Sequence, residues 1–205
     1  MLNKEKQTMF TGIIECLGQV VEAKHYENGN KELFISAPFV DELVLGQSIA
    51  HNGVCLTVTT IESGIYRVTA IEETLDRTNV GDIDKGDDVN LERCMLANGR
   101  FDGHIVQGHV DTIGICEGVE MKNGSWIFTF SHPEKPEYMT IEKGSICVNG
   151  ISLTVAKSEK DHFSVAIIPY TFENTNLKKV SKGMKINLEF DILGKYLFKM
   201  TQKLT

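Results

Sequence analysis

The sequence lacks the motifs of several common enzyme classes. In 205 residues there is no CxxC pair, no Gly-rich phosphate loop, no Ser-centred nucleophile elbow and no paired His on one helix. These absences argue against a compact zinc site, P-loop nucleotide binding and serine hydrolysis. No window reaches the roughly eighteen continuous apolar residues of a membrane span, and no apolar signal region follows the polar start. We therefore expect no membrane partner.

A surplus of positive charge is also missing. The chain has 21 Lys+Arg against 28 Asp+Glu and a net charge of −7, and only residues 176–205 are basic. Because nucleic-acid binders usually carry a basic surface, we interpret that stretch as a solvated tail and expect no nucleic-acid partner. Five cysteines at wide spacings favour reduced thiols over a disulfide framework, and hence a cytoplasmic protein.

An internal repeat organises the sequence. Shifted by 97 positions, residues 48–92 align with residues 145–189 without a gap, and 18 of these 45 positions are identical. With a shift of 96, Gly12 falls on Gly108. Each copy is long enough to be a domain. We expect an N-terminal extension at residues 1–8, domains at residues 9–102 and 103–191, and a C-terminal segment at residues 192–205.

Each copy is predicted to be rich in β-strand. Short apolar and β-branched runs alternate with turn residues, and Asn52-Gly53 and Asn149-Gly150 are the strongest hairpin signals. Six short strands at this spacing predict a small closed barrel in each copy, so the fold class is all-β. The expected strands are residues 18–23, 32–36, 48–50, 55–61, 66–70, 88–91, 114–119, 126–130, 145–148, 152–156, 163–167 and 185–190.

Helix is predicted to be sparse. Helical turns are expected around residues 39–45 and 134–142. In residues 192–205, apolar side chains recur at helical spacing, which predicts an amphipathic helix. That helix packs on its own barrel or mediates self-association, and the pattern does not decide between the two.

The two copies present paired polar faces. Strand alternation places Cys55 and Thr57 on one side of their strand, and the second copy has Ser152 and Thr154 at the matching positions. Small polar groups beside a glycine turn suit hydrogen bonding to a flat polar ligand. Cross-strand hydrogen bonds that satisfy the same groups are the alternative, and these residues alone favour it.

Three polar positions differ between the copies. Cys55 would be a nucleophile only if its pKa were lowered, and a free cysteine is commonly a small buried hydrophobe. His109 takes the place of Ile13, and Asp191 takes that of Cys94. A solvent-facing histidine is the alternative for His109.

The spacing of two histidines bears on a metal site. His104 and His109 are five residues apart, which in an extended segment turns their imidazoles to opposite faces. No shared metal is expected.

Long ordered motifs occur in both repeats. They are Met9-Phe10-Thr11-Gly12-Ile13-Ile14-Glu15, Ser48-Ile49-Ala50-His51-Asn52-Gly53-Val54-Cys55-Leu56-Thr57-Val58, Glu73-Thr74-Leu75 with Arg77-Thr78-Asn79, Gly103-His104 with Gly108-His109, Asn149-Gly150-Ile151-Ser152-Leu153-Thr154-Val155 and Ile168-Pro169. Together they resemble the riboflavin synthase alpha-chain family over nearly the whole chain. The resemblance implies two similar six-stranded Greek-key barrels from an internal duplication, and a C-terminal α-helix that assembles a homotrimer.

The activity implied by the resemblance is a transferase reaction, the last step of riboflavin biosynthesis. One 6,7-dimethyl-8-ribityllumazine donates a four-carbon unit to another, giving riboflavin and 5-amino-6-(D-ribitylamino)uracil. No metal or redox cofactor is implied, and lumazine synthase is a candidate partner. The duplication then has a chemical reason, since two copies of one molecule bind, one per barrel. The family pairs the N-terminal barrel of one subunit with the C-terminal barrel of a neighbour.

The resemblance also assigns site residues. The residues implicated in catalysis are Phe10, Ser48, Cys55, His109 and Asp191. Substrate contacts of the first barrel would be Gly12, Ile13, Ile14, Cys55, Leu56, Thr57, Thr69, Ala70, Ile71, Glu72, Glu73, Thr74, Gly108, His109 and Val110. Those of the second barrel would be Lys143, Ser152, Leu153, Thr154, Ile168, Pro169, Tyr170, Thr171, Phe172 and Glu173.

A mechanism follows as a hypothesis. His109, or a base beside it, removes a proton from the acidic C7 methyl of one lumazine. Cys55 or an activated water adds to the other ring, and Ser48 assists proton transfer. We assign most of the acceleration to stacking the two substrates in reacting geometry.

Two other interpretations stay open. A non-catalytic lumazine- or flavin-binding relative, such as the luminescence accessory proteins on this fold, would be expected to lose polar groups in one barrel, whereas Cys55, His109 and Ser152 are all present. A structural duplicated barrel without a ligand would leave the paired polar faces unexplained. One departure from the family is that eight residues precede Met9, either because translation begins at Met9 or because they form an arm near the site.

Overall fold

The two copies form two separate β-barrels. The computed structural model describes residues 9–202, so the expected extension at residues 1–8 lies outside the described residues, as do residues 203–205. Within the described part, each copy closes into an antiparallel barrel of six strands, in the orders β1-β2-β5-β4-β3-β6 and β7-β8-β11-β10-β9-β12. The second order equals the first with every number raised by six, so the duplication extends to topology. The prediction of two six-stranded barrels is confirmed.

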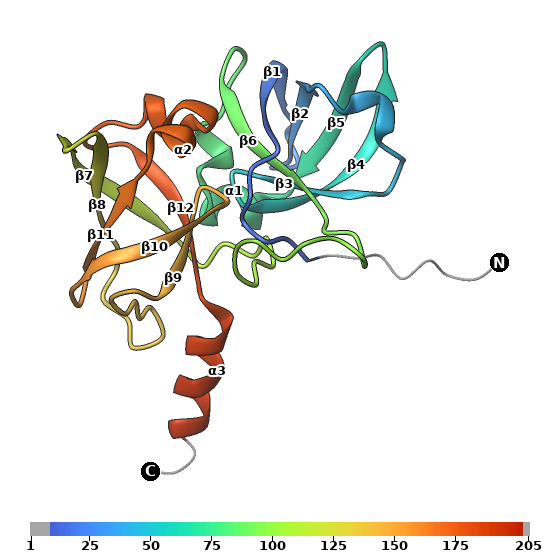
Figure 1. The fold of residues 1–205 in the computed structure, drawn as a ribbon. Coiled ribbons are helices and arrows are strands. Elements are labelled where there is room, and N and C mark those ends of the chain that lie inside the picture. The colour runs from blue at the N-terminus through green and yellow to red at the C-terminus, as the bar shows by residue number, and fades with distance from the viewer. Residues whose placement is uncertain (1–8, 203–205) are drawn as a thin grey trace.

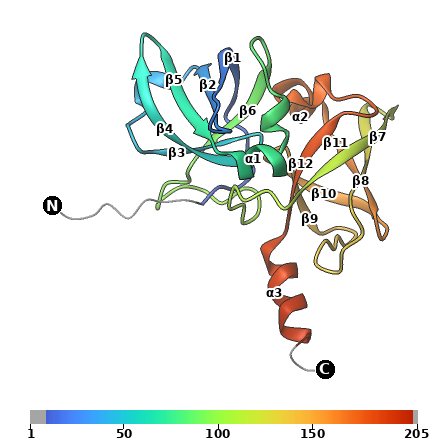
Figure 2. The same cartoon turned by 180° about the vertical axis from the view of Figure 1, so that it is seen from behind.

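The strands agree with the predicted segments to within a few residues. In the first barrel they are β1 (Cys16–His25), β2 (Lys31–Ser36), β3 (Ser48–His51), β4 (Val54–Glu62), β5 (Ile65–Ala70) and β6 (Asp88–Arg93). In the second they are β7 (Thr112–Lys122), β8 (Ser125–Ser131), β9 (Ser145–Val148), β10 (Ile151–Ser158), β11 (His162–Ile167) and β12 (Lys185–Phe190). Figures 1 and 2 show the barrels side by side, with the C-terminal helix projecting away from the second barrel.

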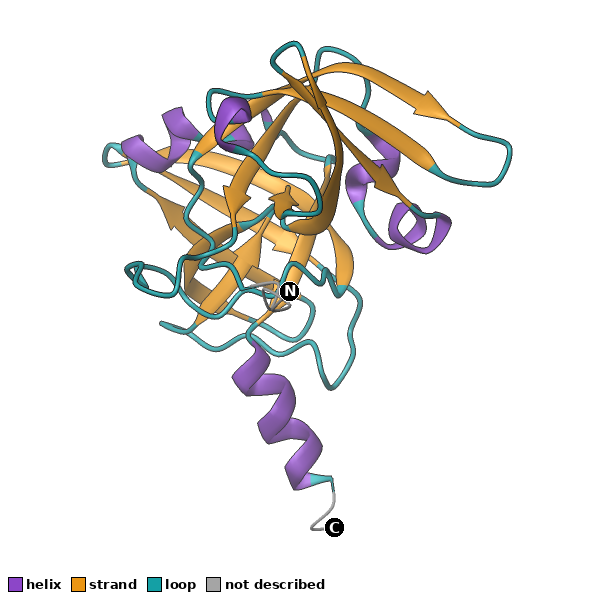
Figure 3. Ribbon diagram, turned by 90° about the vertical axis from the view of Figure 1, so that its right-hand side faces the viewer, coloured by secondary structure: helices purple, strands orange, loops and turns teal. Residues whose placement is uncertain are grey.

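The helices are short. They are η1 (Val40–Glu42), α1 (Glu72–Arg77), η2 (Asn79–Asp82), α2 (Pro169–Asn174), η3 (Asn176–Lys179) and α3 (Ile192–Thr201). The predicted C-terminal helix is confirmed as α3, which stands apart from the strands in Figure 3. The turn expected near residues 39–45 is η1, whereas residues 134–142 form no helix. Sequence analysis missed α1 and α2 because each has six residues and no buried side chain, too little for a helical period.

Strand alternation separates core from surface on the predicted faces. On β4, Leu56 and Val58 are buried in the first core, whereas Cys55 and Thr57 point away from it. The second barrel has its own apolar core, so each copy buries a full set of side chains.

Six buried asparagines join the barrels: Asn52, Asn79, Asn90, Asn149, Asn176 and Asn187. We call them the asparagine cluster. The side-chain amide of Asn90 donates to Asn176 Oδ1 at 2.9 Å, and that of Asn187 donates to Asn79 Oδ1 at 2.9 Å. At the centre of this junction the backbones touch, since a Cβ added at Gly53 would lie 2.8 Å from Gly150 N. The cluster explains why these residues recur in both copies.

Candidate active site

Two extended segments connect the barrels at their base. We call residues 10–14 the first strap and residues 106–110 the second strap. They run antiparallel, with Phe10 N donating to Val106 O at 2.8 Å and Val106 N to Phe10 O at 3.1 Å. In Figure 1 they run below the barrels, on the side from which α3 projects.

Each strap leads into its own barrel but lies against the other one. In the first strap, Gly12 O accepts a hydrogen bond from Ser152 N of β10 at 2.8 Å, and Ile14 packs on the second core. In the second strap, Gly108 O accepts from Cys55 N of β4 at 2.9 Å, and Val110 packs on the first core. The straps are therefore exchanged, which means that each one contacts the barrel formed by the other copy.

This exchange changes one part of the expected site. The resemblance grouped Gly12, Ile13 and Ile14 with the first barrel, whereas the structure places Gly12 and Ile14 against the second. The contact depends on how the barrels sit relative to each other, which the repeat alone does not specify.

The second strap completes a pocket beside the first barrel. This cavity of about 280 Å³ is lined by Val54, Cys55, Glu73, Thr74, Arg77, Thr78, Gly108, His109 and Val110. It brings together six of the predicted contact residues from β4, α1 and the second strap. Its volume is just under the usual range of about 300–1,000 Å³ for ligand sites, and its walls mix apolar, hydroxyl and charged groups.

Cys55 lies in this pocket as a protonated thiol. Burial raises the pKa of Cys55, the Ser48 hydroxyl lowers it by hydrogen bonding, and the Glu189 carboxylate raises it further. Burial is the largest of these effects and outweighs the Ser48 hydrogen bond, so a standing thiolate nucleophile is disfavoured. Ser48 itself is buried beside Cys55, on β3.

The remaining expected catalytic residues of the first barrel differ in exposure. His109 is exposed on the second strap, where its side chain reaches the pocket. Phe10 is fully buried with Ala50, Val106 and Cys147. Its ring lies close to Gly108, because a Cβ added there would be 3.0 Å from Phe10 Cε2. Phe10 therefore supports the second strap from within.

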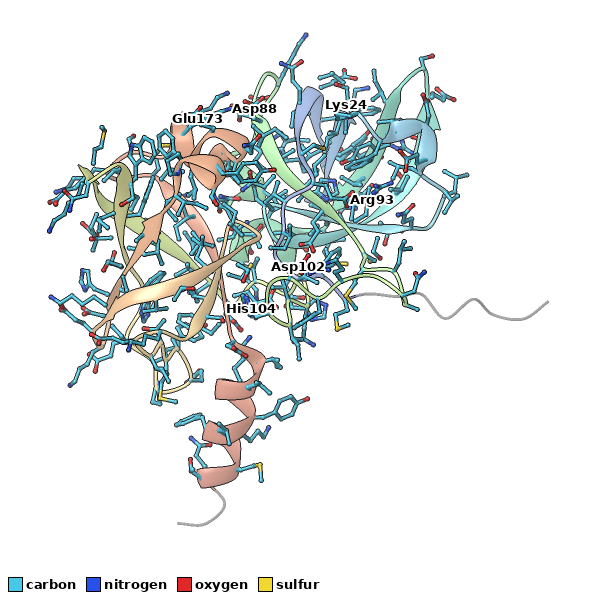
Figure 4. All side chains as sticks on the ribbon, in the orientation of Figure 1. Lys24, Asp88, Arg93, Asp102, His104 and Glu173 are labelled. Carbon is cyan, nitrogen blue, oxygen red and sulfur yellow. The ribbon has the colours of Figure 1, made fainter. Side chains whose placement is uncertain are left out.

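On the second barrel, Ser152 is paired with a histidine. His104 Nδ1 lies 2.7 Å from Ser152 Oγ. Burial lowers the pKa of His104, and the nearby Asp191 carboxylate opposes that shift, so the imidazole is neutral at pH 7. Figure 4 labels His104 between the barrels, near the start of α3. Asp191 caps α3 by accepting from Leu193 N at 3.0 Å.

Sequence reasoning did not include His104 among the candidate site residues. In the sequence its spacing from His109 bears only on a shared metal site. The Gly103-His104 motif was a signal for it, but the pairing with Ser152 requires the chain to fold back over 48 residues.

An aromatic stack supports the second barrel's expected contact segment. Trp126 of β8 and Phe172 of α2 are parallel, with ring centroids 3.9 Å apart. Ile168 and Tyr170 are exposed beside them, so this corner offers apolar and aromatic surface. Trp126 is the one tryptophan of the chain, which makes it a fluorescent reporter of this corner.

Other expected contacts fall into three groups. The side chains of Leu56, Ala70 and Leu153 point into the cores, so these residues offer a ligand only their backbone. Those of Thr57, Ile71, Glu72, Thr154, Pro169 and Glu173 are exposed, and those of Thr69 and Thr171 are partly buried. Lys143 is exposed and has a left-handed backbone with φ of 66°.

Two buried glutamates anchor the straps. Glu92 of β6 accepts hydrogen bonds from the first strap, and Glu189 of β12 accepts them from the second. Burial raises the pKa of Glu189 to about 7, an effect that the backbone N–H of Gln107 opposes. Among residues 9–202, no group of three or more His, Cys, Asp or Glu side chains could hold a metal ion.

Comparison with known proteins identifies the fold family of the two barrels. The Lumazine binding domain family matches the chain twice, at residues 11–94 and 107–191. The solved structure of LumP complexed with 6,7-dimethyl-8-(1'-D-ribityl) lumazine superimposes with a TM-score of 0.79 at 18% identity, covering 88% of this chain and 98% of that one. LumP complexed with riboflavin gives a TM-score of 0.80 at 19% identity, with the same coverage. The protein thus has the duplicated lumazine-binding fold.

Relatives that are similar in sequence identify the family more specifically. Riboflavin synthase of Actinobacillus pleuropneumoniae is 45% identical over 191 residues, which is 92% of this chain and 88% of that protein. Riboflavin synthase of Bacillus subtilis (strain 168) is 36% identical over 195 residues, covering 95% and 91% respectively. The chain belongs to the riboflavin synthase family. In the part of the chain that the structure describes, no helix is long and apolar enough to cross a membrane.

Proposed function

We propose that the protein is a riboflavin synthase. It catalyses the dismutation of two 6,7-dimethyl-8-ribityllumazine molecules, in which a four-carbon unit passes from one to the other to give riboflavin and 5-amino-6-(D-ribitylamino)uracil. The observation that carries this proposal is the pair of pseudo-equivalent sites. Cys55 beside Gly108 in one barrel corresponds to Ser152 beside Gly12 in the other, which suits two copies of one substrate.

The side chains suggest how the reaction is divided. His109 is exposed at the first pocket and is the proposed base for the C7 methyl of one lumazine. Cys55 enters as a neutral thiol, so its addition to the other ring requires its proton to pass to a neighbour, for which Ser48 is in hydrogen-bond contact. His104 Nδ1 shares a hydrogen bond of 2.7 Å with the Ser152 hydroxyl, which holds that hydroxyl toward the second site. Positioning of the two rings supplies most of the acceleration.

We further propose a homotrimer that assembles through α3. Its apolar side chains Leu193, Tyr196, Leu197 and Met200 are each 59–65% exposed in the single chain. An exposed apolar stripe of this kind favours a partner helix. In such an assembly the first-barrel pocket of one subunit would face the second-barrel site of a neighbour. A Leu197→Asp variant should lower the mass measured by light scattering; a variant that keeps the native mass would refute assembly through α3.

Three finer assignments belong to the same proposal. The domains are bounded at residues 9–102 and 103–191, close to the two family matches at residues 11–94 and 107–191. The protein acts in the cytoplasm, where its free thiols stay reduced. Lumazine synthase is the proposed macromolecular partner.

The decisive test is incubation of pure protein with 6,7-dimethyl-8-ribityllumazine. Formation of riboflavin supports the synthase. Binding without product would favour the non-catalytic lumazine- or flavin-binding alternative, and neither binding nor product would leave a structural barrel.

A further inference from the structure

We propose that Glu92 and Glu189 are positioning residues that act across the barrel boundary, each holding the strap that completes the site of the other barrel. The inference rests on the proposed function, because it concerns the two substrate sites. Neither glutamate was among the site residues expected from the sequence.

Glu189 holds the second strap through three backbone groups. Its carboxylate accepts from Gln107 N at 2.6 Å, Gly108 N at 3.0 Å and His109 N at 3.1 Å. The residue belongs to β12 of the second barrel, yet this strap lines the pocket of the first barrel beside Cys55. Glu189 is buried, at 3% exposure, so the interaction is shielded from water.

Glu92 holds the first strap in the same way. Its carboxylate accepts from Thr11 N at 2.7 Å, Thr11 Oγ1 at 2.9 Å and Gly12 N at 2.9 Å. It belongs to β6 of the first barrel, yet the carbonyl of Gly12 is bonded to Ser152 N in the second. The two glutamates occupy equivalent positions of the repeat, so the exchange is reciprocal.

Two features separate positioning from simple burial of a charge. Among the described residues, no cation forms an ion pair with either carboxylate, and both carboxylates accept hydrogen bonds from strap groups. The strap groups they fix are adjacent to the carbonyls that bond to Cys55 N and Ser152 N. Each acid therefore sets where the strap lies relative to the polar face of the opposite barrel.

The matched variants Glu189→Gln and Glu92→Gln test the proposal. Glutamine keeps the volume but presents an NH₂ to backbone N–H donors, so part of the strap loses its acceptor. The probe is riboflavin, the proposed product, because it does not turn over. Occupancy is followed by NMR, using the Thr74 amide for the first pocket and the Trp126 indole N–H for the second site.

We expect Glu189→Gln to weaken riboflavin binding about tenfold at the first pocket and to leave the second within about twofold. Glu92→Gln should do the reverse. Loss in the glutamate's own barrel, equal loss at both sites, or no loss would overturn the proposal.

Amide hydrogen exchange at Gly12 and Gly108 without ligand provides an independent readout. Exchange should rise at Gly108 only in Glu189→Gln, and at Gly12 only in Glu92→Gln; unchanged exchange in both variants would overturn the proposal. Failure of the wild-type protein to bind riboflavin would instead count against the proposed function. Unchanged thermal unfolding midpoints would show that both variants fold.

Discussion

The asparagine cluster yields the most direct prediction about stability. Asn90 contributes three side-chain hydrogen bonds across the junction: Nδ2 donates to Asn149 O at 2.9 Å and Asn176 Oδ1 at 2.9 Å, and Oδ1 accepts from Asn176 N at 2.8 Å. Asn90→Ala removes all three and leaves their partners in a junction where Asn149 and Asn176 are 2% and 8% exposed. The substitution therefore leaves polar groups from the other barrel without their partner.

The magnitude follows from these contacts. An unsatisfied buried polar group costs about 1–3 kcal/mol, so three would cost about 3–9 kcal/mol without relief. A cavity of about 300 Å³ borders Asn149 and Asn176, so water that enters it can relieve part of this cost. We therefore expect a loss near the low end, about 3 kcal/mol, which is a large part of a typical stability of about 5–15 kcal/mol.

Urea unfolding measures this loss. Asn98→Ala is the matched control, because Asn98 is exposed in a turn and its substitution should change stability by less than about 0.5 kcal/mol. Because the cluster joins the barrels, Asn90→Ala should also reduce the cooperativity with which the two barrels unfold. A loss below about 1 kcal/mol with a single unchanged transition would refute the reasoning.

Three further predictions concern individual residues. Burial lowers the pKa of His51 from 6.5 to about 4, so between these pH values the unfolded state binds a proton that the folded state does not. As the pH drops from 6.5 to 4, the free energy of unfolding of the wild-type protein should therefore fall by about 3 kcal/mol relative to that of His51→Gln. A difference between the two proteins that stays constant with pH would contradict this. Gly108→Ala should weaken riboflavin binding at the first pocket by at least about tenfold, because the added Cβ would lie 2.6 Å from Cys55 Cβ. Gly124→Ala is the control: Gly124 has the same left-handed backbone but free space around it, so this variant should bind riboflavin normally. Equal affinities of the two variants would exclude the second strap from the site. Cys55→Ala should reduce turnover more than lumazine binding, and unchanged turnover would remove Cys55 from the mechanism.

The strands could be predicted because their signals are local. Alternation and glycine turns repeat in both copies, so each segment is supported twice, as Asn52-Gly53 and Asn149-Gly150 show. The short helices α1 and α2 could not be predicted, since each has six residues and no fully buried side chain, too few to show a helical period.

The site could be predicted only in part. The first pocket gathers Cys55, Thr74 and His109 as the resemblance implied. The exchange of the straps depends on contacts between the two barrels. An internal repeat predicts the strands of each barrel but not how the two barrels pack against each other. Glu92 and Glu189 are identical residues at equivalent positions of the repeat. That identity alone does not distinguish a residue that anchors a strap from one that packs in a core.

The central claim is that each chain binds lumazine at two pseudo-equivalent sites, one per barrel, and that the dismutation takes place between the first-barrel site of one subunit and the second-barrel site of a neighbour. The most direct test measures stoichiometry: pure protein is incubated with 6,7-dimethyl-8-ribityllumazine, and substrate and both products are quantified by chromatography. The account predicts that two lumazines disappear for each riboflavin and each 5-amino-6-(D-ribitylamino)uracil formed. Lumazine bound but not consumed, or riboflavin formed without the pyrimidine in equal amount, would contradict it.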